Sequence, residues 1–135
     1  MRIHLLFTLN LFFMVGCNYG LTPSSERLQK AARVQLPEGS QVLRDEYQDM
    51  GQDYVVYYDI KLRNDSIAKF IKSIQNSGVY SSEGQPMSTF QESNNFRIWY
   101  RTGNRYEFEG KLERVLYSIS LDTSTCIMKY EEFVL

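Results

Sequence analysis

The chain has 135 residues, with 15 lysines and arginines against 16 aspartates and glutamates, a formal net charge of −1 and 43% hydrophobic residues. This nearly neutral balance lacks the basic excess of a nucleic-acid-binding domain, so no nucleic-acid partner is expected. The length is that of a single domain with enough chain to bury a core.

The first seventeen residues carry the clearest signal. Arg2 and the amino terminus precede an apolar run that is interrupted only by Thr8 and Asn10 and ends in Met14-Val15-Gly16-Cys17. The run is typical of a secretory signal peptide and is short for a transmembrane helix of about 20 residues. Its last four residues resemble the lipobox of bacterial lipoproteins. The resemblance implies that the thiol of Cys17 receives a lipid, that the chain is cleaved before Cys17, and that the new amino terminus is acylated, with palmitate as a typical chain.

These features divide the chain into a signal peptide (1–16), a lipidated amino terminus and tether (17–25) and a single α+β domain (26–135). The lipid bilayer is then the first partner, bound through acylated Cys17, and the protein is expected on a membrane of the cell envelope. Asn18 resembles the pattern that directs lipoproteins of Gram-negative cells to the outer membrane. Two alternatives stay open, an ordinary signal peptide cleaved nearby and an uncleaved anchor in which Cys17 is incidental.

Few residues of the mature chain are suited to catalysis. The single histidine, His4, lies in the segment expected to be removed, which leaves no histidine base or ligand. Cys126 has no intrachain partner if Cys17 is acylated, and we expect it to be a buried apolar residue. Glu107 and Glu109 share a strand face with Arg97 as their expected neighbour, which favours a solvated surface. We therefore predict no catalytic residue, no cofactor and no metal site.

The elements follow in chain order. A short helix is predicted over 24–33, and Pro37 and Gly39 then break it. Strands follow at 42–47 and 54–62, the second with Tyr54, Val56, Tyr58, Ile60 and Leu62 on one face. Apolar residues at helical spacing predict the main helix over 65–76. The polar stretch 81–95 is predicted to be a long loop, and the remainder, 96–135, to be strands.

The register of the last two hairpins is predicted by keeping one face apolar. A three-residue loop at 102–104 places Tyr100 opposite Tyr106, Ile98 opposite Phe108, and Arg97 opposite Glu109. A two-residue turn would mix apolar and charged residues on each face, and is rejected on that ground. In the last hairpin, we expect Leu121 opposite Cys126, Ile119 opposite Met128, and Tyr117 opposite Tyr130.

Together these elements predict an α+β domain with an antiparallel sheet of about six strands in the order β-β-α-β-β-β-β. The helix 65–76 is expected to cover the apolar face of this sheet, with the short amino-terminal helix ahead of it.

The predicted register exposes Trp99 between Arg97 and Arg101, and these residue types are frequent at the energetic centres of interfaces. Met87 and Phe90 are apolar points in the long loop. The sequence thus predicts a non-enzymatic module that binds an envelope protein or a cell-wall partner through these residues. The alternatives are that Trp99 packs beneath the amino-terminal segment or the loop, that the protein is a tethered structural or assembly accessory without a ligand site, or that it is a hydrolase independent of histidine.

Overall fold

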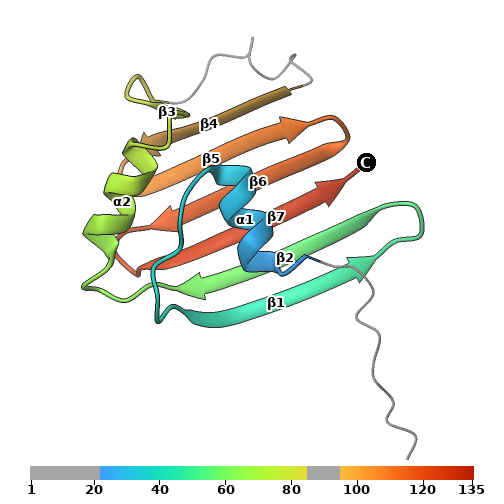
Figure 1. Cartoon of the computed structure of the whole chain (residues 1–135), viewed down its shortest axis with the longest axis horizontal. Helices are drawn as coiled ribbons and strands as arrows, with labels where there is room; N and C mark the ends of the chain where they lie inside the picture. Colours follow the sequence, from blue (N-terminus) through green and yellow to red (C-terminus); the bar gives the residue numbers. More distant parts are fainter. Residues whose placement is uncertain (1–21, 85–94) are drawn as a thin grey trace, which may run out of the picture.

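The computed structural model describes residues 22–84 and 95–135 (Figure 1). These residues form two helices, α1 (Ser24–Ala32) and α2 (Ile67–Gln75), and a single sheet. The strands are β1 (Gln41–Asp49), β2 (Tyr54–Lys61), β3 (Tyr80–Ser81), β4 (Asn95–Thr102), β5 (Arg105–Leu112), β6 (Val115–Asp122) and β7 (Ile127–Val134).

The strands lie in the order β1-β2-β7-β6-β5-β4-β3, so β1 forms one end of the sheet and β3 the other. The predicted α+β class is confirmed. The predicted number of strands was too low by one, because β3 has only two residues and so carries no readable pattern. β3 runs parallel to β4, which makes the sheet mixed, whereas all other neighbouring strands are antiparallel.

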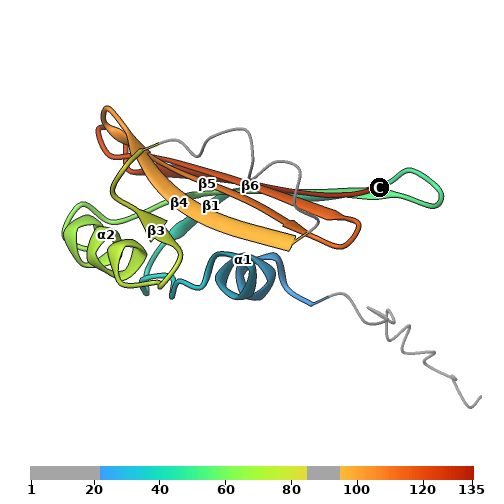
Figure 2. The ribbon, with the colours of Figure 1, turned by 90° about the horizontal axis from the view of Figure 1, so that it is seen from above.

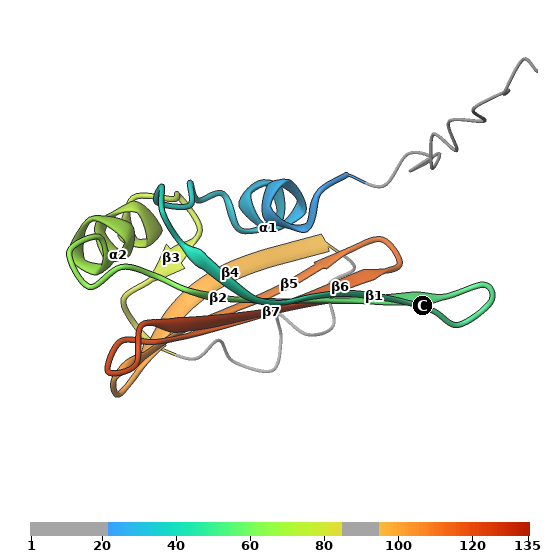
Figure 3. The ribbon, with the colours of Figure 1, turned by 90° about the horizontal axis from the view of Figure 1, so that it is seen from below.

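Both helices lie on one face of the sheet, and views from above and below show that neither covers the other face (Figures 2 and 3). The two predicted helices are confirmed within a few residues at each end. α1 buries Leu28, Ala31 and Ala32, whereas α2 buries Phe70 and Ile74. We call the face beneath the helices the inner face and the opposite one the outer face.

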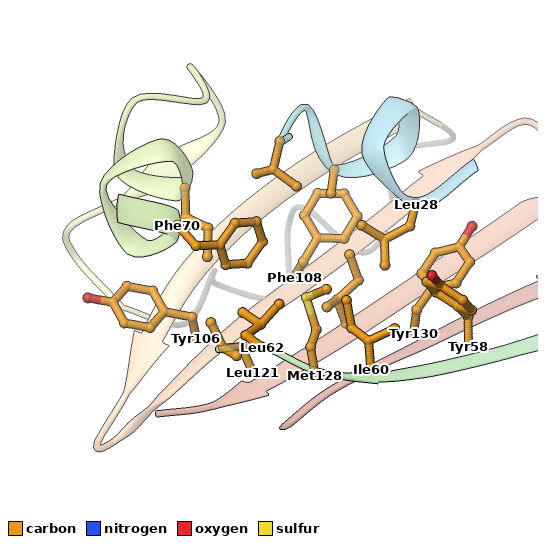
Figure 4. Packing of buried hydrophobic residues seen from close by; sticks show 14 of the residues in the cluster. Leu28, Tyr58, Ile60, Leu62, Phe70, Tyr106, Phe108, Leu121, Met128 and Tyr130 are labelled. Carbon is orange, nitrogen blue, oxygen red and sulfur yellow. The ribbon is translucent and has the colours of Figure 1, made fainter. Parts of the chain in front are cut away.

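The core lies between the inner face and the helices (Figure 4). Side chains alternate across a strand, so the even-numbered residues of β2 and β7 point inward together. Tyr58 and Ile60 of β2 lie in this layer beside Met128 and Tyr130 of β7. The predicted apolar face of the second strand is therefore confirmed.

The predicted register of the β4–β5 hairpin was wrong. Thr102 pairs with Arg105 around a two-residue turn, which places Trp99 opposite Phe108 and Tyr100 opposite Glu107. Gly103 has φ +60 at the first turn position, where a tight hairpin turn of this kind requires a positive φ. This register places the aromatic Tyr100 on the same face as two glutamates. That face tolerates the mixture because the hydroxyl of Tyr100 donates a hydrogen bond of 2.7 Å to Glu109 Oε1.

The last hairpin has the predicted faces but a different register. Leu121 pairs with Met128 and Ile119 with Tyr130, two residues away from the predicted pairing. The turn is longer because Cys126 lies within it, with φ +56, instead of pairing in the ladder. A shift of two residues leaves every side chain on its original face. Cys126 is buried as predicted, and within the described part of the chain it is a free cysteine.

Candidate functional site

Of the residues predicted to contact a membrane or a partner, Cys17, Met87 and Phe90 lie outside the described residues. Trp99, Arg97 and Arg101 lie on β4, and all three are on its inner face. The structure thus places the predicted surface cluster on the side of the sheet that the helices cover.

Trp99 is fully buried, with 0% of its surface exposed, so the prediction that it is an exposed contact residue was wrong. Its indole Nε1 donates a hydrogen bond of 2.9 Å to the carbonyl oxygen of Ala32, the last residue of α1. Its ring centroid lies 5.2 Å from that of Phe108. The alternative interpretation, packing beneath the amino-terminal segment, is confirmed, and Trp99 connects the end of α1 to the sheet.

The two arginines lie on either side of this tryptophan and face different surroundings. Arg97 is half-buried, and its Nε is enclosed without a hydrogen-bond partner among the described residues. It lies opposite Gly110, the only described residue on the inner face of β5 that has no side chain. Arg101 is exposed, donates from Nε to the Gly103 carbonyl oxygen at 2.9 Å, and lies 5.7 Å from the Tyr106 ring. The pair does not form one contact surface.

A buried polar network occupies the inner face beneath α1. Glu132 of β7 is almost fully buried and forms an ion pair with Arg27 of α1. Arg27 donates to both carboxylate oxygens, while Tyr54 donates to Oε1 at 2.8 Å and Tyr130 to Oε2 at 2.6 Å. Four hydrogen bonds therefore hold the Glu132 carboxylate between α1, β2 and β7.

The pKa values of this network follow from those contacts. Burial alone raises the pKa of Glu132, but the hydrogen bonds from Arg27, Tyr130 and Tyr54 outweigh it and hold the pKa below its usual value. Burial and the hydrogen bond to Glu132 raise the pKa of Tyr54 to about 12. The carboxylate is thus ionised and its lone pairs are occupied, which suits a structural clamp better than proton transfer.

The sequence contains a signal for this network that the predictions above did not use. Met128, Tyr130 and Glu132 alternate along β7, so a strand with two core residues places a glutamate on the same face. A buried carboxylate requires a charged partner. The sequence does not indicate which residue is that partner, because Arg27 is 105 residues away from Glu132 along the chain.

The carboxylates of Glu107 and Glu109 lie on the outer face. Ser120 donates a hydrogen bond of 3.0 Å to Glu107, and Tyr100 donates to Glu109. The pKa of Glu107 is raised above its usual value, because the effect of burial outweighs the Ser120 hydrogen bond and the Arg105 charge, which both lower it. The expectation that Arg97 neighbours this pair was wrong, because the observed register places Arg97 on the opposite face.

Hollows lie at several places on the surface of the described residues. A hollow of about 490 Å³ lies between the connection from α1 to β1 and α2, with Leu36, Pro37, Lys69 and Phe70 in its wall. A second, of about 360 Å³, is lined by Arg33, Arg97 and neighbouring residues. Across residues 22–84 and 95–135 there is no group of acidic, histidine and cysteine side chains that could hold a metal ion.

The exposed apolar side chains gather on one strand. Among the described large hydrophobic residues, four of the six exposed ones belong to β1 or the turn after it: Val42 (53% exposed), Leu43 (47%), Tyr47 (45%) and Met50 (50%). Among the described residues, β1 is also one of the two edge strands of the sheet, and all its residues except Arg44 are exposed. Exposed apolar groups on an edge strand are typical of a protein interaction site.

Comparison of the chain with protein-family models, curated proteins and solved structures finds no match. Within the described part of the chain, neither helix has the length and apolar character needed to cross a membrane. The function is therefore inferred from the residues of the chain and their geometry.

Proposed function

We propose that the protein is a lipid-anchored protein of the bacterial cell envelope whose domain is a non-enzymatic binding module for an envelope protein. The observation that carries this proposal is the free edge strand β1 with its exposed Val42, Leu43, Tyr47 and Met50. The contact surface predicted around Trp99 is replaced by this edge, because Trp99 belongs to the core.

The position of α1 connects the anchor to this surface. Ser24, the first residue of α1, donates a hydrogen bond of 2.6 Å to Asp45 of β1. Seven peptide units separate Cys17 from Ser24, and a fully extended chain of that length spans roughly 25 Å. If Cys17 is lipidated, the β1 edge is held close to the membrane surface and meets partners that are membrane-bound themselves.

The anchor requires more than one acyl chain. A single chain gives only marginal membrane binding, whereas several chains on one residue provide a durable attachment. The lipobox-like Met14-Val15-Gly16-Cys17 would supply them on one cysteine. Metabolic labelling with palmitate tests this directly, because label should be present on the wild-type chain and absent from Cys17→Ala. Label that persists on Cys17→Ala would overturn the anchor.

Photo-crosslinking in cells tests the binding role. A photoreactive residue at Met50, in the turn after β1, should yield a discrete product in the full-length protein, whereas the same residue at Lys72, on the exposed side of α2, should not. A missing product at Met50 would contradict the binding module. It would favour the alternative of a tethered structural or assembly accessory without a ligand site.

A further inference from the structure

We propose that β1 binds its partner by strand addition, and that the incoming segment carries a basic, an apolar and a basic residue at alternate positions. This inference rests on the proposed binding function and specifies how the partner is recognised. In strand addition, an extended segment pairs with the backbone of a free sheet edge, and the alternate side chains provide specificity.

The backbone of β1 is suited to this mode along part of its length. Its pairing with β2 is regular from Arg44 to Asp49, whereas the register shifts between Val42 and Arg44. A bulge interrupts pairing, so the incoming segment is expected along residues 44–49. The backbone edge of this stretch that points away from β2 faces no other strand in the described residues, and Figure 1 shows β1 along the rim of the sheet. The opposite rim ends in β3, which is only two residues long.

The side chains of this stretch that lie on the inner face of the sheet select the partner. Asp45, Tyr47 and Asp49 alternate there, paired with residues of β2 that point toward the helices, and all three are exposed. Side chains directly opposite each other in neighbouring strands interact, and opposite charges stabilise the pair. A lysine or arginine opposite each aspartate and an apolar residue opposite Tyr47 therefore fit this edge. The pattern is symmetrical, so it fits in either strand direction.

Charge disfavours the other occupants of the edge. Residues 41–61 contain five carboxylates and two basic side chains, so the hairpin carries a net charge of −3. A second copy of the chain or an anionic lipid surface would bring like charges together. The one basic residue within 44–49, Arg44, already bonds Glu46 at 2.8 Å and lies 4.0 Å from the Tyr57 ring.

Two synthetic peptides test the proposal on the full-length protein in uncharged detergent micelles. Both have seven residues and alternate threonine with the three test positions, which are lysine, valine and lysine in one peptide and glutamate, valine and glutamate in the other. Fluorescence anisotropy of the labelled peptides measures binding, and amide hydrogen exchange locates it. The lysine peptide should bind about tenfold more tightly than the glutamate peptide, and exchange should slow within 44–49.

Charge reversal on the protein provides the control. The double variant Asp45→Lys/Asp49→Lys should prefer the glutamate peptide, whereas Glu83→Lys/Glu131→Lys, with the same change in net charge away from the edge, should keep the preference for lysine. Because Asp45 also accepts the Ser24 hydrogen bond, Asp49→Lys alone serves as a second variant with that bond intact, and it should lose about threefold of the preference. Equal binding of both peptides to the wild type, or a preference unchanged by Asp49→Lys, would overturn recognition by the aspartates. Exchange that does not slow within 44–49 when the lysine peptide binds would overturn strand addition.

The same variants separate this inference from the binding function. A Met50 crosslink in cells that persists unchanged in Asp45→Lys/Asp49→Lys would leave the binding module standing and overturn recognition by the aspartates. A crosslink lost in this variant and kept in Glu83→Lys/Glu131→Lys supports both.

Discussion

Glu132 shows how one residue can determine the position of a helix. Its carboxylate receives hydrogen bonds from Arg27 of α1, Tyr54 of β2 and Tyr130 of β7, so three elements meet at one buried charge. Such a group stabilises the fold only while its partners remain, because an unpaired buried charge is costly.

Glu132→Gln tests this clamp while keeping the side-chain shape. We expect a loss of about 2–4 kcal/mol in the free energy of unfolding, because Arg27 loses its counter-charge. The loss should fall short of that at fully buried pairs, since the Arg27 side chain keeps 17% of its surface exposed. Urea denaturation measures the change, and Glu131→Gln, on the exposed side of the same strand, should stay within about 0.5 kcal/mol. Equal values for the two variants would contradict the clamp.

The clamp also predicts a dependence on pH. The pKa of Glu132 is lower in the folded state than its ordinary value of 4.5, so the unfolded state takes up the proton first on acidification. The stabilisation is present above the unfolded pKa and is lost as pH falls through the folded one. The stability difference between wild type and Glu132→Gln should therefore be constant near neutral pH and shrink below about pH 4.5. A difference that grows on acidification would contradict the direction of the shift.

At the scale of elements, α1 is attached to the sheet at both ends. Ser24 bonds Asp45 on β1 at its start, and the carbonyl oxygen of Ala32 accepts from Trp99 on β4 at its end. α1 therefore runs across the strands on the inner face, and Figure 1 shows it over the middle strands of the sheet.

Trp99→Phe tests the second attachment. The change keeps an aromatic ring but leaves a buried carbonyl oxygen without its donor, and it should cost about 2–3 kcal/mol in unfolding free energy. Amide exchange should accelerate in α1 more than in α2. Tyr57→Phe, on the outer face, is the matched control and should have little effect. A neutral Trp99→Phe would contradict the attachment of α1 through this residue.

The β4–β5 turn carries a separate prediction. Gly103 has φ +60, a conformation that side chains with a Cβ rarely adopt, although a Cβ added there would meet nothing within 4 Å. Gly103→Ala should therefore destabilise the protein by about 1 kcal/mol through backbone strain alone. Asn104→Ala, at the next position, should be milder. Similar thermal unfolding of both variants would contradict the two-residue turn.

The strength of sequence patterns explains which parts of the fold were predictable. β2 and α2 were predicted because alternation and helical spacing are unambiguous in them. The β4–β5 register was mispredicted because Arg97 and Arg101 lie on the covered face, where long side chains can bury their stems. Tyr100 lies on the opposite face, where Glu109 binds its hydroxyl. Keeping one face of a hairpin wholly apolar is thus a poor criterion for predicting its register where many of the side chains are amphipathic.

The candidate site was harder to predict than the fold. A slip of one residue in the register moves Trp99 from the surface to the core, so its predicted role failed with the register. The β1 edge could not be recognised, because the sequence does not show which strand ends the sheet. Its exposed Val42 and Tyr47 read as ordinary strand residues until the sheet order is known.

At the scale of the whole molecule, the described domain has a face covered by two helices and an outer face without helices. One edge of its sheet is β1, whose far side faces no other described strand, and at the other edge β3 pairs with two residues of β4. The amino-terminal helix starts against the β1 edge, so the described part of the chain begins beside the proposed binding surface. This arrangement suits a module that meets its partner near a membrane, where tethering raises the effective concentration of both.

Amide hydrogen exchange on the anchored full-length protein tests the role of the β1 edge most directly. Exchange in isolated envelope membranes should be compared with exchange of the purified protein in detergent micelles. We expect slower exchange in the membranes at residues 44–49 of β1, with no change in α2. Slower exchange confined to α2 or to the outer face of β4–β6, or no difference anywhere in the domain, would contradict the β1 edge as the binding surface.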